Sequence, residues 1–201
     1  MDQRSLPKQT LGRLPNYLAY LRTQPCGEDD YISATTIARD LGIGEVQVRK
    51  DLHAASGDGR PRVGYQTAQL IAQIENLLGA QNPAKAVLVG TGKLGRALLG
   101  YEGFLTFGID IAAGFNNIPQ DNDGKKPIYP MEQLPSYCRE NGVRIGIITV
   151  PKDQAQAVAD LLVANGITAI WSFAPVTVPK NVFLLQENLA LSLAHVKTFA
   201  R

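Results

Sequence analysis

Six residues near the middle of the chain constrain its fold more than any other segment: Gly90-Thr91-Gly92-Lys93-Leu94-Gly95. They follow an apolar strand pattern at residues 86–89 and begin a helical pattern at residues 93–99. In such a strand–turn–helix unit the first glycine permits a tight turn, the second lets a pyrophosphate approach the backbone, and the third lets the helix pack on the strand. The free amides at the helix start then face the anion. The pattern predicts a dinucleotide site, and the alternatives are an empty glycine turn or a site for another phosphate-bearing ligand such as coenzyme A.

The residues after this glycine loop alternate between strand and helix patterns. Strands are predicted at 104–113, 144–150, 170–173 and 182–185, and helices at 131–140 and 152–165. This alternation is typical of an α/β domain whose helices cover both faces of a parallel sheet. We therefore expect a Rossmann-type, doubly wound parallel sheet over residues 81–186. A C-terminal segment, 187–201, carries one more amphipathic helix at 189–199.

The first 80 residues carry helical patterns instead. Helices are predicted at 13–23, 34–41, 45–55 and 66–78, the second of them capped by Ser33 and ended by Gly42. The turn Gly42-Ile43-Gly44 joins the second helix to the third as in a helix-turn-helix. The glycine-rich, basic residues 56–65 suit a hairpin wing. A turn-rich break at 79–84 separates this predicted winged helix-turn-helix domain, 1–80, from the sheet domain.

The third predicted helix carries the side chains expected to read DNA. Gln47, Arg49 and Lys50 are polar, and arginine and glutamine can contact guanine and adenine through two hydrogen bonds in the major groove. The alternatives are a solvated basic helix face, or an Arg49 held inside the fold by Asp40 or Asp51.

The remaining residues of this helix and the wing are expected to divide between core and DNA backbone. Val46, Val48 and Leu52 are expected to face the core. Arg60 and Arg62 are expected to meet phosphates or the minor groove. The formal net charge of the whole chain is only +2, so a local basic face is expected rather than a basic domain.

Composition is ordinary for a soluble protein, with 45% hydrophobic and 19% charged residues. The first residues are polar and no apolar run reaches the ~18 residues of a membrane span, so neither a signal peptide nor a transmembrane helix is expected. Cys26 and Cys138 lie far apart, which predicts neither a disulfide framework nor a metal site. We expect a reduced, cytoplasmic setting.

Groups for hydride-transfer chemistry are not apparent. An enzyme of that class places a general acid or base beside the reacting carbon. The chain has two histidines, His53 on the third predicted helix and His195 on the last, and neither follows a predicted strand, where chemistry in this fold is located. No Ser-Tyr-Lys constellation with helical spacing is apparent. We therefore expect a sensor without catalytic residues rather than a dehydrogenase.

Asn116 stands where NAD sites carry an acid that bonds the ribose hydroxyls, about 20 residues beyond the glycine loop. Asparagine can bond a hydroxyl but lacks the charge that repels a 2′-phosphate. No arginine follows to bind that phosphate either. NAD is favoured over NADP, and the strictness of this preference stays open.

These motifs together resemble the Rex family of bacterial redox-sensing transcriptional repressors over essentially the whole chain. The matching segments are residues 13–17 (RLPNY), 47–52 (QVRKDL), 64–65 (GY), 87–98 (VLVGTGKLGRAL), 148–151 (ITVP) and 173–175 (FAP). The resemblance implies a homodimer that binds double-stranded operator DNA while NAD⁺ is plentiful and releases it when NADH rises. It also implies that the C-terminal helix is exchanged between subunits.

The resemblance further implies roles for single residues. Tyr101 matches a tyrosine near the nicotinamide, and Arg13 matches an arginine that links the DNA-binding domain to the exchanged helix. The expected NAD(H) site comprises Gly90, Thr91, Gly92, Lys93, Leu94, Gly95, Tyr101, Asn116, Thr149, Val150, Pro151, Phe173, Ala174 and Pro175. The expected DNA-binding surface comprises Ser33, Gln47, Arg49, Lys50, Arg60, Arg62, Gly64 and Tyr65.

Three positions depart from the family pattern. Asn116 and Ser172 replace an aspartate and an asparagine, respectively. Glu187-Asn188 stands where the exchanged helix carries an aspartate that pairs with the arginine matched by Arg13. We expect an interdomain switch that involves Arg13, Tyr101 and either Glu187 or Asn188.

The leading hypothesis is a redox-sensing repressor. The alternatives are a nicotinamide-dependent oxidoreductase with an appended DNA-binding domain, and a coenzyme A- or nucleotide-binding module.

Overall fold

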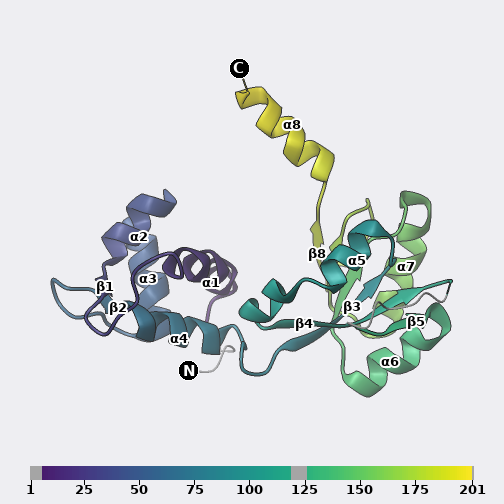
Figure 1. Ribbon diagram of the computed structural model, residues 1–201, viewed down its shortest axis with the longest axis horizontal. Helices are drawn as coiled ribbons and strands as arrows, with labels where there is room; N and C mark the ends of the chain where they lie inside the picture. Colours follow the sequence, from purple (N-terminus) through teal and green to yellow (C-terminus); the bar gives the residue numbers. More distant parts are fainter. Residues whose placement is uncertain (1–5, 119–125, 201) are drawn as a thin grey trace. The chain divides into compact units, whose positions relative to one another are not determined.

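The structure, a computed structural model, describes residues 6–118 and 126–200. These residues divide into two compact units (Figure 1). The first unit comprises the described residues up to Pro83 together with Leu105–Gly108, and the second comprises the rest. Each unit has a hydrophobic core of its own.

The first unit is built from four helices and a two-stranded sheet. The helices are α1 (Lys8–Leu21), α2 (Ala34–Leu41), α3 (Glu45–Ser56) and α4 (Thr67–Leu77), and the strands are β1 (Tyr31–Ile32) and β2 (Tyr65–Gln66). The Ser33 hydroxyl caps α2 by accepting a hydrogen bond from the Thr36 amide over 3.0 Å. Gly42 ends α2 in the left-handed conformation, with φ of 64°. The helix-turn-helix expected from the sequence is thereby confirmed.

Three features of this unit differ from the sequence prediction. Helix α1 begins at Lys8 rather than at residue 13, so Pro15 lies inside the helix. The pairing of β1 with β2 was not predicted, because two-residue strands separated by more than thirty residues leave no alternating pattern. The expected wing is short: Arg60 and Gly64 form a single antiparallel bridge at its base.

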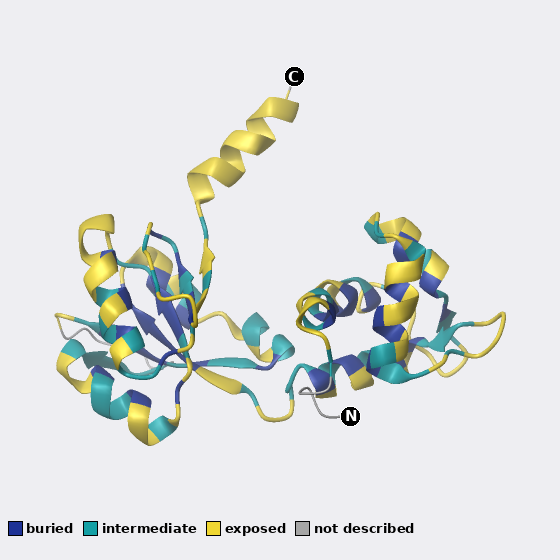
Figure 2. Ribbon diagram, turned by 180° about the vertical axis from the view of Figure 1, so that it is seen from behind, coloured by how far each residue is buried: buried dark blue, intermediate teal, exposed yellow. Residues whose placement is uncertain are grey.

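The core of the first unit is apolar and is formed by one face of each helix. Its fully buried members include Leu14, Leu18, Ile37, Val48, Leu52, Leu70 and Ile74. Figure 2 shows these faces turned inward, with exposed residues on the outer sides of the helices. The spacing of the buried positions is that of amphipathic helices, which explains why the sequence located all four.

A buried carboxylate joins α3 to α1. Asp51, on α3, is 1% exposed. It accepts hydrogen bonds from Thr10 Oγ1 (2.9 Å), from Arg13 Nε and Nη2 (2.6 and 2.8 Å) and from Tyr17 Oη (2.7 Å). Burial alone would raise the pKa of Asp51, but the bonds from Arg13, Tyr17 and Thr10 outweigh it and hold the pKa below its ordinary value. Asp51 is therefore ionised at neutral pH, and its bonds fix α3 against α1.

The second unit is a six-stranded sheet in the order β5-β4-β3-β6-β7-β8, and every neighbouring pair is parallel. The strands are β3 (Ala84–Val89), β4 (Ile109–Asn116), β5 (Ile128–Pro130), β6 (Ile145–Ile148), β7 (Ala169–Ser172) and β8 (Phe183–Gln186). The chain runs outward from β3 in both directions. The order of the strands thus reverses between β3 and β6, where open α/β sheets bind ligands at the carboxyl ends of the strands.

Helices cover both faces of this sheet, as predicted. One face packs against α6 (Leu134–Asn141) and α7 (Lys152–Ala164). The other packs against α5 (Lys93–Leu99). The last helix, α8 (Leu189–Phe199), has no buried residue, and Figure 2 shows it exposed along its length.

Two predicted elements of the second half were wrong in part. The strand expected at 104–113 begins only at Ile109, because Glu102–Phe107 forms a 3₁₀ helix, η2, and Gly108 follows with φ of 71°. The helix expected at 131–140 starts as a 3₁₀ turn, η3 (Met131–Gln133), before α6. In both cases a short apolar run is compatible with several structures, and packing decides among them.

Replacing Tyr17 by phenylalanine tests the buried network. Burial, followed by the hydrogen bond to Asp51, raises the pKa of Tyr17 to about 12. Because its folded pKa is raised, Tyr17 stabilises the unit fully below about pH 10, the ordinary pKa of an unfolded tyrosine, and this contribution is lost as the pH rises further. We expect Tyr17→Phe to lower the free energy of unfolding by about 2 kcal/mol at neutral pH. This deficit should shrink between pH 10 and pH 12.

Urea unfolding followed by circular dichroism measures both effects. Tyr31→Phe is the control, since Tyr31 is half-buried in the same unit but lies outside the network. A deficit for Tyr17→Phe that stays constant up to pH 12 would show that this tyrosine does not couple stability to pH.

Candidate functional site

The glycine loop leaves β3 at Val89 and enters α5 at Lys93. Gly90 has φ of 99°, and its amide donates to the carbonyl oxygen of Phe115 over 2.9 Å. A Cβ atom on Gly90 would lie 2.8 Å from the backbone nitrogen of Val150. The turn therefore accepts only glycine here, on grounds of both conformation and space.

Gly95 sets how closely α5 approaches the loop. A Cβ atom on Gly95 would overlap the carbonyl oxygen of Gly90 and lie 2.9 Å from Thr149 Oγ1. At Gly92, by contrast, a Cβ atom would meet nothing within 4 Å. The third glycine is thus required by packing, whereas the second leaves open space beside the first turn of α5. That space suits a phosphate group, which the amides of this turn can bind.

Thr149 fastens the loop to the neighbouring strand. Its Oγ1 lies 2.6 Å from the carbonyl oxygen of Gly90 and 3.1 Å from that of Val89. Thr149 follows β6, and its amide donates to Val89 O over 2.9 Å. Val150 and Pro151 continue from it towards α7. The segment matched to the family's cofactor loops therefore lies directly against the glycine loop.

The remaining residues expected at the cofactor site follow the carboxyl ends of neighbouring strands. Val89 on β3 pairs with Phe115 on β4 and with Ile148 on β6, which in turn pairs with Ser172 on β7. Asn116 and the Phe173–Pro175 segment come next along the chain, at the same edge of the sheet. The parallel register thus brings these sequence-predicted segments to the edge that also carries the glycine loop.

Asn116 and Ser172 also stabilise the loops that follow their strands. Asn116 Oδ1 accepts a hydrogen bond from the Asn117 amide over 2.9 Å. Ser172 is fully buried, and its hydroxyl donates to Ala174 O over 2.7 Å. The serine that departs from the family pattern therefore shapes the turn before Pro175.

Tyr101 ends a row of aromatic rings beside this edge. Its ring lies edge-on to Phe104 at 5.0 Å, Phe104 lies edge-on to Trp171 at 6.0 Å, and Trp171 contacts Phe173 at 4.6 Å. Tyr101 is 61% exposed. Aromatic packing thus connects Tyr101, after α5, with the loop after β7, and it leaves the tyrosine accessible to a ligand.

The expected DNA-contacting residues gather in the first unit around one hollow of about 560 Å³ between α3 and the wing. Its lining includes Ser33, Arg49, Lys50, Arg60, Arg62, Gly64 and Tyr65, which are seven of the eight residues named from the sequence. Gln47 lies on the same helix outside this lining. Burial raises the pKa of Tyr65, which keeps its phenol neutral. Cationic side chains around a concave surface suit a phosphate backbone.

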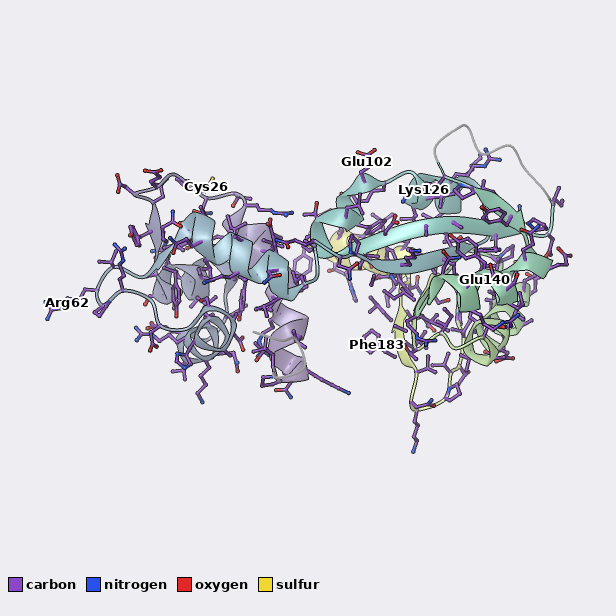
Figure 3. The ribbon with its side chains drawn as sticks, turned by 90° about the horizontal axis from the view of Figure 1, so that it is seen from below. Cys26, Arg62, Glu102, Lys126, Glu140 and Phe183 are labelled. Atoms are coloured by element: carbon purple, nitrogen blue, oxygen red, sulfur yellow. The ribbon has the colours of Figure 1, made fainter. Side chains whose placement is uncertain are left out.

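The wing holds its arginines in different ways. The Arg60 and Gly64 backbones exchange hydrogen bonds of 2.7 and 2.9 Å, which close the hairpin. The Arg60 guanidinium lies 5.1 Å from the centre of the Tyr31 ring. Arg62, at the tip, has φ of 63° and projects outward (Figure 3). One wing arginine is therefore held against β1, and the other extends into solvent.

Arg49 pairs with Glu45, at 2.6 Å and one turn away, and not with Asp40 or Asp51, the partners that the alternative had named. One expectation for α3 was wrong. Val46 is 67% exposed, whereas Val48 and Leu52 are buried as expected. Residue 46 lies about 200° around the helix from residue 48, so the two cannot share the core face.

His53 and Asp58 also line the hollow, although neither was expected to bind DNA. His53 Nδ1 lies 2.8 Å from Asp58 Oδ1. The sequence offered one signal: His53 is one turn beyond Arg49 on the same helix.

The expected switch residues are distributed over both units. Arg13 lies in the first unit and binds Asp51, whereas Tyr101, Glu187 and Asn188 lie in the second. The Glu187 amide donates to Ser172 O over 2.8 Å. Asn188 caps α8 by accepting from the Leu191 amide over 2.9 Å. The Asn188 side chain therefore stabilises the start of α8, whereas Glu187 takes part in these contacts through its backbone amide.

Residues 6–118 and 126–200, which the structure describes, contain no group of three His, Cys, Asp or Glu side chains that could hold a metal ion. None of the helices there is long and apolar enough to cross a membrane.

Comparison with protein families and solved structures matches both units. A family described as "CoA binding domain" matches residues 81–176, and one described as "Putative DNA-binding protein N-terminus" matches residues 5–53. Among solved structures, "RSP, a Rex-family repressor" superposes with a TM-score of 0.82 at 29% identity, covering 98% of this chain and 95% of that one. RSP in complex with β-NAD⁺ and operator DNA gives a TM-score of 0.81 at 29% identity, covering 97% of this chain and 92% of that one.

Similar proteins with established names extend this match to the sequence. The redox-sensing transcriptional repressor Rex of Porphyromonas gingivalis is 40% identical over 194 residues, 94% of this chain and 89% of that protein. Rex of Bacteroides fragilis is 37% identical over 198 residues, 96% of this chain and 90% of that protein. Because this similarity runs through both units, the chain belongs to the Rex family of redox-sensing transcriptional repressors.

Proposed function

We propose that this protein is a redox-sensing transcriptional repressor that binds operator DNA and releases it when NADH rises relative to NAD⁺. The proposal rests on one observation: a single chain joins a helix-turn-helix unit to a sheet whose glycine loop leaves open space at a helix N-terminus. Solved structures of the similar protein RSP contain β-NAD⁺ with operator DNA, or β-NADH. Both ligands of the proposed switch are thus bound by a structural relative.

The proposed cofactor site follows the edge of the sheet. The amides of residues 90–95 and the start of α5 bind the pyrophosphate, and Asn116 bonds a ribose hydroxyl. Thr149–Pro151 and Phe173–Pro175 flank the two ends of the dinucleotide. Tyr101 lies near the nicotinamide. His53 and His195 lie on α3 and α8 and not on the loops that follow the strands, so a sensing role without proton transfer accounts for the site better than catalysis does.

The proposed DNA-binding surface combines α3 with the wing. Gln47, Arg49 and Lys50 on α3 enter the major groove and contact base edges. The Arg49–Glu45 pair is exposed on both sides, so its opening costs little and frees the guanidinium for DNA. Arg60 and Arg62 contact the DNA backbone or the minor groove. Ser33, Gly64 and Tyr65 complete the surface around the hollow.

The functional protein is proposed to be a homodimer that exchanges α8. Five large apolar side chains of α8 are 54–87% exposed: Leu189, Leu191, Leu193, Val196 and Phe199. An isolated helix of this length is marginal in water, so its apolar side chains call for a partner surface. A second copy that supplies this surface would let Glu187 and Asn188 take part in a switch with Arg13 and Tyr101.

The assigned parts are then a DNA-binding domain over 1–80, an NAD(H)-binding domain over 81–186 and an exchange segment over 187–201. The protein is expected to act in the cytoplasm. A band-shift titration of an operator fragment against NADH and NAD⁺ tests the function. Release on raising the NADH/NAD⁺ ratio supports it, whereas binding that is equal at every ratio contradicts redox control.

A coenzyme A-binding module is the second candidate, because the family matched over residues 81–176 is described by that ligand. Calorimetry with NADH, NADPH and coenzyme A separates the two. Binding of coenzyme A alone would replace the redox proposal.

Replacing Gly95 by alanine should impair cofactor binding. The added methyl group overlaps Gly90 O, so α5 must move away from the loop that is proposed to bind the pyrophosphate. We expect NADH affinity to fall at least about tenfold, which is the loss of one good hydrogen bond to a charged group. Operator binding without cofactor should persist, but NADH should no longer cause release.

Gly100→Ala is the matched control, since Gly100 ends the same helix with φ of −87°, and a Cβ atom there would make only an ordinary van der Waals contact, at 3.6 Å from Arg96 O. Calorimetry measures the affinity. Wild-type NADH binding by Gly95→Ala would place the cofactor elsewhere.

Arg49 and Arg60 should differ in how their loss changes the salt dependence of DNA binding. Arg49→Ala removes a base contact and should weaken operator binding by about 1–3 kcal/mol with little change of slope. Arg60→Ala removes a phosphate contact and should lower the slope of log K against log salt by about one unit. Fluorescence anisotropy over a range of salt concentrations measures both.

Arg39→Ala provides the control, because Arg39 is exposed on α2 and pairs with Asp40 outside the hollow. Equal slope changes for Arg49→Ala and Arg60→Ala would overturn the division between base and phosphate contacts.

A further inference from the structure

We propose that Asp51, which is itself buried, determines DNA sequence preference by fixing the orientation of the Gln47 side-chain amide. Asp51 would thus be a positioning residue for a base contact that Gln47 makes. The inference rests on the proposed operator-binding function. It adds a residue that need not touch DNA to those that set specificity.

The contact lies within one turn of α3. Gln47 Nε2 donates a hydrogen bond to Asp51 Oδ1 over 3.1 Å. Gln47 itself is exposed, whereas Asp51 is 1% exposed. The pair thus links a side chain at the surface of the helix to one in the interior of the unit.

The chemistry of the pair permits one orientation of the amide. An ionised carboxylate only accepts hydrogen bonds, so the glutamine must turn its nitrogen, and not its oxygen, towards Asp51. The flipped amide would place two acceptor oxygens against each other. With Nε2 held by Asp51, the Gln47 oxygen and the second N–H of Nε2 remain available to a ligand.

This arrangement matches the needs of adenine recognition. Glutamine reads adenine by accepting from N6–H and donating to N7 at the same time. A fixed amide presents that acceptor and donor in one order only. A freely turning amide would present either order and lose part of its preference for adenine.

The carboxylate is held rigidly enough to perform this task. Thr10, Arg13 and Tyr17, all on α1, donate to its two oxygens over 2.6–2.9 Å. The Arg13 contact is bidentate and side-on, which fixes direction as well as distance. Asp51 is therefore held in place by side chains of a second helix, and its hydrogen bond with Gln47 restricts the Gln47 amide in turn.

A neighbouring pair on the same helix lacks this anchoring. Glu45 and Arg49 have the same four-residue spacing and lie 2.6 Å apart, but their side chains are 41% and 66% exposed. Solvent competes for such a pair and lets both side chains move. The Glu45–Arg49 pair thus supplies a matched comparison of equal spacing and opposite burial.

Selection of preferred sites from a random DNA library tests the proposal with the full-length protein. We expect Gln47→Ala to lose the base preference at one position of the selected site, a preference of roughly tenfold to a hundredfold for a bidentate contact. Asp51→Asn should lose most of the preference at that same position and keep it at the others. Glu45→Gln should keep it. The double variant Gln47→Ala/Asp51→Asn should lose no more than Gln47→Ala, because the two act as one unit.

Each outcome decides a different claim. A wild-type protein that selects no site contradicts the proposed function itself. A selected site that Gln47→Ala leaves unchanged, or an Asp51→Asn variant that keeps the Gln47 preference, overturns this inference alone. A uniform loss of affinity by Asp51→Asn with an unchanged site also overturns it, since that indicates a purely structural role.

If Asp51→Asn does not fold, a measurement on the wild-type protein tests whether the Gln47 amide is held. In the wild-type protein, one side-chain N–H of Gln47 should exchange with solvent at least about tenfold more slowly than those of the exposed Gln73, as measured by NMR. Equal exchange at the two glutamines would show that the Gln47 amide is not held.

Discussion

The contact between Gly95 and the carbonyl group of Gly90 sets how closely α5 approaches β3, and the candidate cofactor site depends on it. No side chain fits between them. The close approach brings the amides of the first turn of α5 to the edge of the sheet, where Thr149 fastens the loop from the other side. A pyrophosphate bound there would interact mainly with backbone groups and a helix dipole, neither of which depends on pH. The glycine loop therefore accounts for binding of the pyrophosphate, which NADH and NAD⁺ share.

The two units position their functional groups by opposite means. In the sheet unit, glycines without side chains leave room for a ligand. The helical unit uses a charged side chain, Asp51, that is buried and satisfied by four donors from α1 besides Gln47. Burying a carboxylate costs free energy unless all of its hydrogen bonds are made. Removal of any of these donors should therefore destabilise the packing of α3, the helix that carries Asp51. Arg13, which the family resemblance assigns to a switch, is also the counter-ion that makes this burial possible.

The sequence predicted those features that local sterics decide. The glycine loop, the Ser33 cap and the end of α2 at Gly42 follow from rules that act within a few residues, and all were confirmed in the structure. Features that depend on partners far along the chain escaped prediction. Asp51 and Arg13, for example, are 38 residues apart. Likewise, the apolar residues 104–107 matched a strand as well as they matched the 3₁₀ helix that packing selected.

We propose that NADH binding at the glycine loop and operator binding by α3 and the wing are coupled within one protein. Thermodynamic linkage makes this coupling reciprocal: if NADH weakens operator binding by some factor, the operator must weaken NADH binding by the same factor. NADH affinity measured by calorimetry with and without saturating operator DNA tests this directly. We expect weaker NADH binding in the presence of the operator, by the factor that NADH imposes on DNA binding. An NADH affinity that is the same with and without the operator would contradict it.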